Sequence, residues 1–141
     1  MTEGSLAFPI IQRTITTEQI ARYAEASGDN NPLHLDPAFA SQSQFGVVVA
    51  HGMLTLAFVS EMLTGAFGRH WLESGRLKVR LKAPAYPGDE LRTWGEVVRE
   101  DDHEGTRKVV CAVGLKDGND RELIAGDAVV HLPARESLGG N

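Results

Sequence analysis

The feature that most constrains the fold is a very apolar helical segment in the middle of the chain. It runs from Gly52 to about His70 and is expected to be the longest helix. Its first two turns leave little polar surface, because they contain Met53, Leu54, Leu56, Ala57, Phe58 and Val59. A helix that is apolar on nearly all sides is usually buried within a fold. We therefore expect the rest of the chain to wrap around this segment.

The second half of the chain supplies the strands for a sheet. Residues 76–82 alternate apolar and basic side chains, as expected of a half-exposed strand, and the turn cluster APAYPGD follows at 83–89. Three further strands are expected at about 89–99, 106–117 and 121–132. In the last of these, Gly126 and Ala128 are small enough to let a helix approach closely. The pattern predicts an α+β domain whose antiparallel sheet wraps one central helix, and whose free edges favour a homodimer.

The first half of the chain carries clear helix signals. A short strand at 10–15 is expected to precede a helix with Thr16 as its N-cap and Gln19 as the reciprocal partner of that cap. Gly28 suits a left-handed cap at the end of this helix. An Asp-Pro pair predicts a second, short helix over about 36–42.

The stretch SGDNNPLHLD, residues 27–36, places a carboxylate and an imidazole close together. Pro32 disfavours helical geometry for the residue before it, so we expect neither a regular helix nor a regular strand here. Asp29 and His34 can hold one water molecule between a proton acceptor and a second acid/base group, as the addition of water to a double bond requires. The alternative is structural, with Asp29 accepting backbone hydrogen bonds in a turn.

The start of the apolar helix offers a site for developing negative charge. If the double bond is conjugated to a thioester carbonyl, hydration builds an enolate-like oxygen. Free backbone N–H groups at a helix N-terminus, beginning at Gly52, can receive that oxygen. A simple turn glycine remains the alternative at this position.

Composition excludes several classes of function. Lys and Arg number 14 against 19 Asp and Glu, and the net charge of −5 gives no general attraction to nucleic acid or anionic membranes. The single cysteine, Cys111, rules out an internal disulfide and is expected to be a buried apolar residue. The first residues do not resemble a signal peptide and no apolar stretch is long enough to span a bilayer, so a cytoplasmic protein is expected. The five histidines show no metal-ligand spacing, so no metal site is expected.

Two segments of the chain resemble a known family. YAEASGDNNPLHLDPAFA, followed by FGVVVAHGML, resembles the MaoC-like hydratases and dehydratases, particularly the (R)-specific 2-enoyl-CoA hydratases. The match is dense over residues 23–54 and continues through the APAYPGD turn and GDAVVHLP. The resemblance implies a hot-dog fold, here assigned to residues 1–135, and a homodimer. The residues at 136–141 are separately expected to form a flexible tail.

The resemblance also implies roles for individual residues. Asp29 and His34 would be the catalytic pair, Gly52 the backbone donor that polarises the thioester carbonyl, and Asn31 and Ser60 supporting residues that line the pocket. His51, just before the helix, is expected to shape the turn and is counted among the substrate-binding residues. No cofactor is expected, because coenzyme A or acyl carrier protein carries the acyl group.

The implied reaction is the reversible hydration of a trans-2-enoyl thioester to the (3R)-hydroxyacyl thioester. A 3-hydroxyacyl-carrier-protein dehydratase would use the same chemistry. The same fold and ligand would also suit a hot-dog thioesterase, or a non-catalytic acyl-thioester-binding subunit of a heterodimer. The basic residues Lys78, Arg80 and Lys82 are either a solvated strand face or a contact for the phosphates of coenzyme A.

Overall fold

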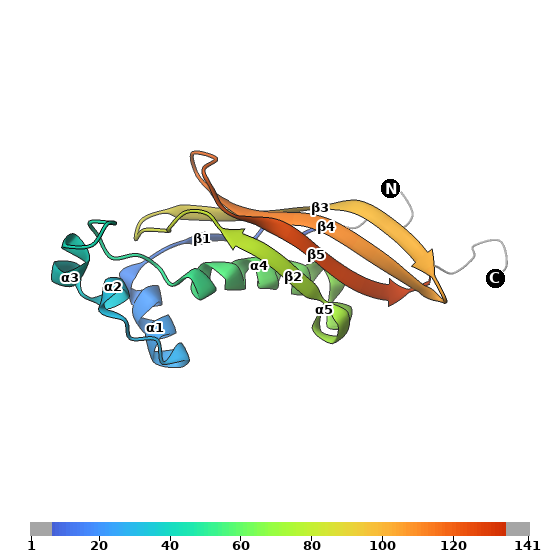
Figure 1. Ribbon diagram of the computed structural model, residues 1–141, viewed down its shortest axis with the longest axis horizontal. Helices are drawn as coiled ribbons and strands as arrows, with labels where there is room; N and C mark the ends of the chain where they lie inside the picture. Colours follow the sequence, from blue (N-terminus) through green and yellow to red (C-terminus); the bar gives the residue numbers. More distant parts are fainter. Residues whose placement is uncertain (1–6, 135–141) are drawn as a thin grey trace.

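A curved antiparallel sheet packed along one long helix forms the body of the protein (Figure 1). The computed structural model describes residues 7–134 of the chain. The five strands lie in the order β1-β3-β4-β5-β2, and every neighbouring pair is antiparallel. The elements are β1 (Gln12–Thr14), α1 (Thr17–Ser27), α2 (Pro32–Leu35), α3 (Pro37–Ser41), α4 (Gly52–Phe67), α5 (Arg69–Ser74), β2 (Arg76–Leu81), β3 (Glu90–His103), β4 (Thr106–Asp117) and β5 (Glu122–Pro133). The expected α+β architecture is confirmed.

The core lies between α4 and the concave face of the sheet. Helix α4 buries Leu54, Thr55, Phe58, Val59, Met62, Leu63 and Phe67. Facing them, β4 contributes four fully buried side chains, namely Val109, Cys111, Val113 and Leu115. Each large apolar side chain buried in this way contributes about 1.5–3 kcal/mol to folding. The expected burial of α4 is confirmed on the side that faces the sheet, while a stripe through Met53, Ala57 and Glu61 on its other side is exposed within this chain.

The close approach between helix and sheet occurs at a different glycine from the one expected. A Cβ atom on Gly95 of β3 would lie 2.9 Å from Cδ1 of Phe8 and 3.1 Å from Cε of Met62, so this glycine makes room for Phe8 as well as for α4. At Gly126 of β5 the nearest atoms belong to the backbone of Lys78 and Val79 instead. Gly126 of β5 therefore leaves room for the backbone of the neighbouring strand β2.

The helix boundaries follow local signals with three exceptions. Thr16 caps α1 by accepting from the Gln19 N–H, and Gly28 ends the helix in the left-handed conformation, as predicted. The reciprocal half of the capping box is not formed, since Oε1 of Gln19 has no hydrogen-bond partner among the described residues. The apolar helix stops at Phe67 rather than His70, because Gly68 (φ 60°) breaks it and α5 begins at a new angle.

The third exception lies in the 27–36 stretch, where a four-residue helix, α2, forms. Asn31 is extended before the proline, as expected (φ −56°, ψ 128°). Its side chain accepts from the Leu33 N–H at 2.9 Å, and Pro32 takes the first helical position, where it is well tolerated. The expectation that this stretch contains no regular helix is therefore wrong, because it contains one helical turn.

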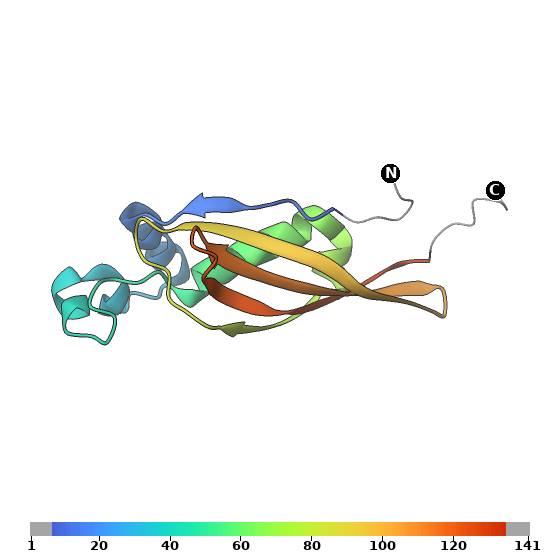
Figure 2. The same cartoon turned by 90° about the horizontal axis from the view of Figure 1, so that it is seen from above.

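Helices α1, α2 and α3 gather at one end of the molecule, beside the N-terminus of α4 (Figures 1 and 2). The 27–36 stretch and Gly52 are thus brought to the same end. No helix in the described part of the chain is long and apolar enough to cross a membrane. The predicted tail, 136–141, lies outside the described residues.

Candidate active site

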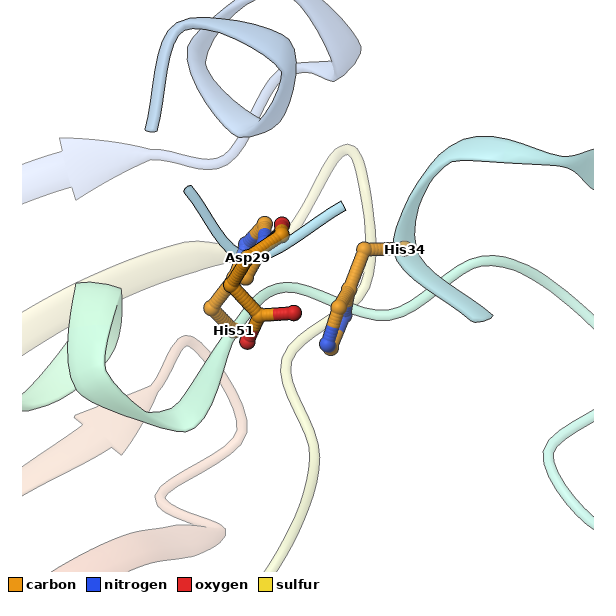
Figure 3. A group of neighbouring side chains, drawn as sticks. All are labelled: Asp29, His34 and His51. Carbon is orange, nitrogen blue, oxygen red and sulfur yellow. Dashed lines mark hydrogen bonds between the residues drawn. The ribbon is translucent and has the colours of Figure 1, made fainter. Parts of the chain in front are cut away.

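Three side chains from separate segments meet at the N-terminal end of α4. Asp29 follows the end of α1, His34 lies on α2, and His51 is the N-cap residue of α4. Each contributes one carboxylate oxygen or ring nitrogen to a group of atoms that all lie within 4.8 Å of one another. Figure 3 shows the Asp29 carboxylate on the side that faces the His34 ring. The expected proximity of Asp29 and His34 is present in the structure.

The tautomer of His34 follows from its backbone partner. Its Nδ1 atom lies 2.7 Å from the carbonyl oxygen of Val49. A carbonyl oxygen only accepts, so Nδ1 carries the hydrogen and Nε2 is left with a free lone pair. This arrangement leaves Nε2 of a half-buried ring available as a proton acceptor.

Local hydrogen bonds hold the Asp29 turn. Its backbone N–H donates to Oγ of Ser27 at 3.2 Å, and its Oδ1 accepts from the Asn31 N–H at 3.3 Å. The carboxylate is exposed to solvent. Asn31 therefore supports the turn from both ends, through its backbone N–H toward Asp29 and through its side chain toward α2.

A pocket of about 370 Å³ opens beside His34. Gly52 shares its lining, and the first N–H groups of a helix have no partner within the helix. The remaining lining is mostly apolar and comprises Leu33, Phe45, Val49, Ala50, Leu81, Lys82, Ala83 and Pro84. The pocket thus places a proton acceptor and free backbone donors around an apolar cavity.

The wall of this pocket formed by Ala83 and Pro84 is fixed by long-range hydrogen bonds of Pro84 and of the next residue, Ala85. The Ala50 N–H donates to the Ala85 carbonyl at 2.9 Å, and Nη2 of Arg121 donates to the Pro84 carbonyl at 2.8 Å. Arg121 is itself held by Asp117, whose pKa lies below its ordinary value chiefly because its carboxylate accepts from the Arg121 backbone N–H. The β4–β5 turn therefore positions one side of the pocket.

His51 is buried, with 2% of its surface exposed, and does not line the pocket. Its Nε2 atom lies 3.0 Å from the backbone carbonyl oxygen of Asp29. Its ring stacks on the His34 ring with centroids 3.9 Å apart and planes 24° apart. In this chain His51 contacts the two expected catalytic residues rather than the cavity.

The cluster of Asp29, His34 and His51 also contains three potential metal ligands. Sequence spacing did not suggest these ligands, because only folding brings them together. Two of the four ring nitrogens already face carbonyl oxygens. The lone pairs of the two stacked imidazoles lie in two nearly parallel planes, whereas a tetrahedral ion needs them to converge on one point. The absence of a resident metal stays a prediction.

Ser60 lies elsewhere, about two turns further along α4 than Gly52. It is half-buried and does not line the pocket within this chain. Sequence reasoning missed the Val49 carbonyl, because a backbone acceptor leaves no mark on residue type. It also missed Phe45 and Leu81, whose apolar side chains resemble ordinary core residues in the sequence.

Comparison with known proteins identifies the family of the chain. The MaoC-like domain matches residues 8–119. The (R)-specific enoyl-CoA hydratase of Aeromonas caviae is 30% identical over 119 residues, covering 82% of this chain and 84% of that protein. The 3-hydroxyacyl-thioester dehydratase Z of Mycobacterium tuberculosis is 30% identical over 127 residues, covering 86% of this chain and 84% of that protein. The solved (R)-hydratase from A. caviae superimposes with a TM-score of 0.77 at 25% identity, covering 94% of this chain and 100% of that one.

The fold and the relatives together define a hot-dog enzyme of the hydratase and dehydratase class. The chain belongs to the MaoC-like domain family.

Proposed function

We propose that this protein catalyses the reversible hydration of trans-2-enoyl thioesters to (3R)-hydroxyacyl thioesters. The observation that carries the proposal is the proximity of the Asp29 carboxylate to the His34 ring, whose Nδ1 is engaged by the Val49 carbonyl, beside a pocket that His34 and Gly52 both line. The names of the hydratase and dehydratase relatives support the reaction type and its stereochemistry.

In the hydration direction, Asp29 and His34 orient one water molecule and remove a proton from it. The water oxygen forms a bond to the β-carbon of the enoyl group. The electron pair of the double bond moves toward the thioester carbonyl, whose oxygen gains negative charge. The proton then returns from the pair, through Nε2 of His34, to the α-carbon. Water is the only species added, and the reverse sequence is dehydration.

Backbone N–H groups at the start of α4 stabilise the intermediate charge. Gly52 lies at the first helical position, and its missing side chain lets the thioester oxygen approach the backbone. The helix dipole also favours negative charge at this end. In this scheme the protein needs no redox or metal cofactor, and coenzyme A or acyl carrier protein acts only as the carrier.

We also propose a homodimer. Strand β1 pairs with β3 only at Glu90, Leu91 and Arg92. Beyond Thr93, no described strand pairs with this edge of β3, and Val98 there is 62% exposed. A long open edge of this kind is well suited to pairing with a second sheet.

Incubation with crotonyl-CoA tests the proposed reaction. We expect the absorbance of the conjugated enoyl thioester to fall without release of free thiol, and the product to be 3-hydroxybutyryl-CoA of R configuration. Stoichiometric thiol release would identify a thioesterase instead. Binding without turnover, with activity only after addition of a second protein, would identify a subunit of a heterodimer.

A further inference from the structure

His51 contacts both members of the catalytic pair without reaching the pocket. The ring is enclosed between Tyr23, with ring centroids 4.9 Å apart, and His34, with centroids 3.9 Å apart. Although His51 is the N-cap residue of α4, its side chain makes no capping hydrogen bond. Its Nε2 atom and its ring face therefore contact the 27–36 stretch, while its Nδ1 atom has no hydrogen-bond partner among the described residues.

We propose that His51 is a positioning residue that sets the distance and orientation between Asp29 and His34. This inference rests on the proposed function, because it assigns His51 to the same reaction. The Nε2 atom carries the hydrogen and donates to the Asp29 carbonyl, since that oxygen only accepts. The ring face supports His34 by stacking. One side chain thus holds Asp29 through its main chain and His34 through its ring.

The hydrogen bonds within the Asp29 turn show why such a support is needed. The bonds among Ser27, Gly28, Asp29, Asn30 and Asn31 join residues only two positions apart. They shape the turn but do not fix it relative to α4. The bond from His51 spans 22 residues and connects this turn to the start of α4. It therefore fixes where the carboxylate lies with respect to Gly52.

His34 is held from two sides by the same segment. Its Nδ1–H donates to the Val49 carbonyl, and its ring face rests on His51. The hydrogen bond fixes the tautomer and the stacking fixes the tilt of the ring. Displacing either group by about 1 Å from its productive position can cost roughly 10²-fold in rate.

Two substitutions separate the two contacts. His51→Phe keeps an aromatic ring against His34 but removes the N–H that reaches Asp29. His51→Gln keeps an N–H donor of similar reach but removes the ring. His51→Ala removes both. His103→Gln is the matched control, because that side chain is 78% exposed and remote from the site.

We expect each single-contact variant to lower kcat for crotonyl-CoA about tenfold or more, and His51→Ala to lower it roughly 10²-fold. We expect KM to change by less than about threefold, because His51 does not touch the pocket. The ring-proton NMR signals of His34 should lose the ring-current shift of the stacked ring in His51→Gln and keep a ring-current shift in His51→Phe. His103→Gln should match the wild type in all measurements.

Three outcomes would overturn the inference. Wild-type kcat in both His51→Phe and His51→Gln would show that neither contact matters. A rise in KM with unchanged kcat would make His51 a binding residue. Failure of all three variants to fold would make it only a core residue. An inactive wild-type protein would instead refute the proposed function, and the His34 shifts would still test the stacking.

Discussion

The Nδ1 atom of His34 lies 2.7 Å from the carbonyl oxygen of Val49, a residue 15 positions further along the chain. This bond joins α2 to the segment that leads into α4. It commits the neutral imidazole to one tautomer and leaves the lone pair of Nε2 without this partner. The tautomer of His34 is thus determined by a backbone group that has no side-chain signature.

Gly52→Pro tests the role of the backbone donor. Proline is well tolerated at the first position of a helix, and the preceding residue, His51, already has the extended geometry that proline requires (φ −60°, ψ 137°). The substitution therefore removes one N–H while keeping α4. We expect kcat for crotonyl-CoA to fall roughly 10²–10³-fold, with a melting temperature close to that of the wild type.

Gly52→Ala is the control for added bulk. Its Cβ would lie 2.9 Å from Cδ1 of Leu81, the end of a flexible side chain that can move. This variant keeps the N–H, so we expect it to retain much more activity than Gly52→Pro. Equal loss in the two variants would assign the effect to crowding and not to the missing donor.

Lys78 and Arg80 test how the carrier is bound. Both line a hollow of about 500 Å³ on the sheet, and Lys82 lines both this hollow and the pocket beside His34. Lys82 forms an ion pair with Glu122, so we leave it unchanged. If phosphates bind here, the double variant Lys78→Gln, Arg80→Gln should raise KM for crotonyl-CoA with little change in kcat. An unchanged KM would make these residues an ordinary solvated strand face.

The thiol of Cys111 should be unreactive in the folded protein. Burial raises the pKa of its thiol to about 11, with a smaller contribution from the nearby Glu100 carboxylate. We expect no reaction with a thiol reagent at neutral pH until denaturant is added. The folded state holds the thiol proton more tightly than the unfolded state does. The contribution of the protonated thiol to the free energy of unfolding is therefore complete below pH 9.0, and it is lost as the pH rises to about 11.

Denaturant titrations at several pH values check the second half of this prediction. The free energy of unfolding should decline between pH 9.0 and about 11, and the decline should be smaller in Cys111→Ala. The same slope in both proteins would show that other groups are responsible. Rapid labelling at neutral pH would contradict the buried position of Cys111 at the centre of the sheet.

The free edge of β3 should mediate association. We expect sedimentation to give twice the protomer mass of 15.3 kDa. Val98→Lys places a charge on this exposed part of β3, and Val98→Thr is a control that keeps a neutral β-branched side chain. The lysine variant should shift toward monomer while the threonine variant stays dimeric. A wild-type monomer at micromolar concentration would refute the homodimer.

The elements that sequence reasoning predicted well are those determined by neighbouring residues. The cap at Thr16, the left-handed end at Gly28 and the Asp36-Pro37 helix start all depend on contacts within a few positions. The alternating strand patterns were also sufficient to define β2, β4 and β5. Strand β3 continues four residues beyond the predicted end, past a bulge between Val97 and Arg99, because pairing with β4 stabilises a stretch with little apolar alternation.

The parts that could not be predicted depend on contacts distant in sequence. The stacking of His34 on His51 and the hydrogen bond from His51 to Asp29 join segments that only the fold brings together. The break at Gly68 was hidden because a glycine within an apolar run is compatible with either a continuous or an interrupted helix. The pocket wall at Pro84 depends on Arg121, a residue of a distant turn.

The central claim is that Asp29 and His34 jointly activate a water molecule for addition to an enoyl thioester. The most direct measurement is the rate of crotonyl-CoA hydration by Asp29→Asn and by His34→Ala, beside the wild type, with circular dichroism and melting curves to establish that each variant is folded. We predict that each substitution lowers kcat by roughly 10²–10⁴-fold. Wild-type turnover in either folded variant would contradict the claim.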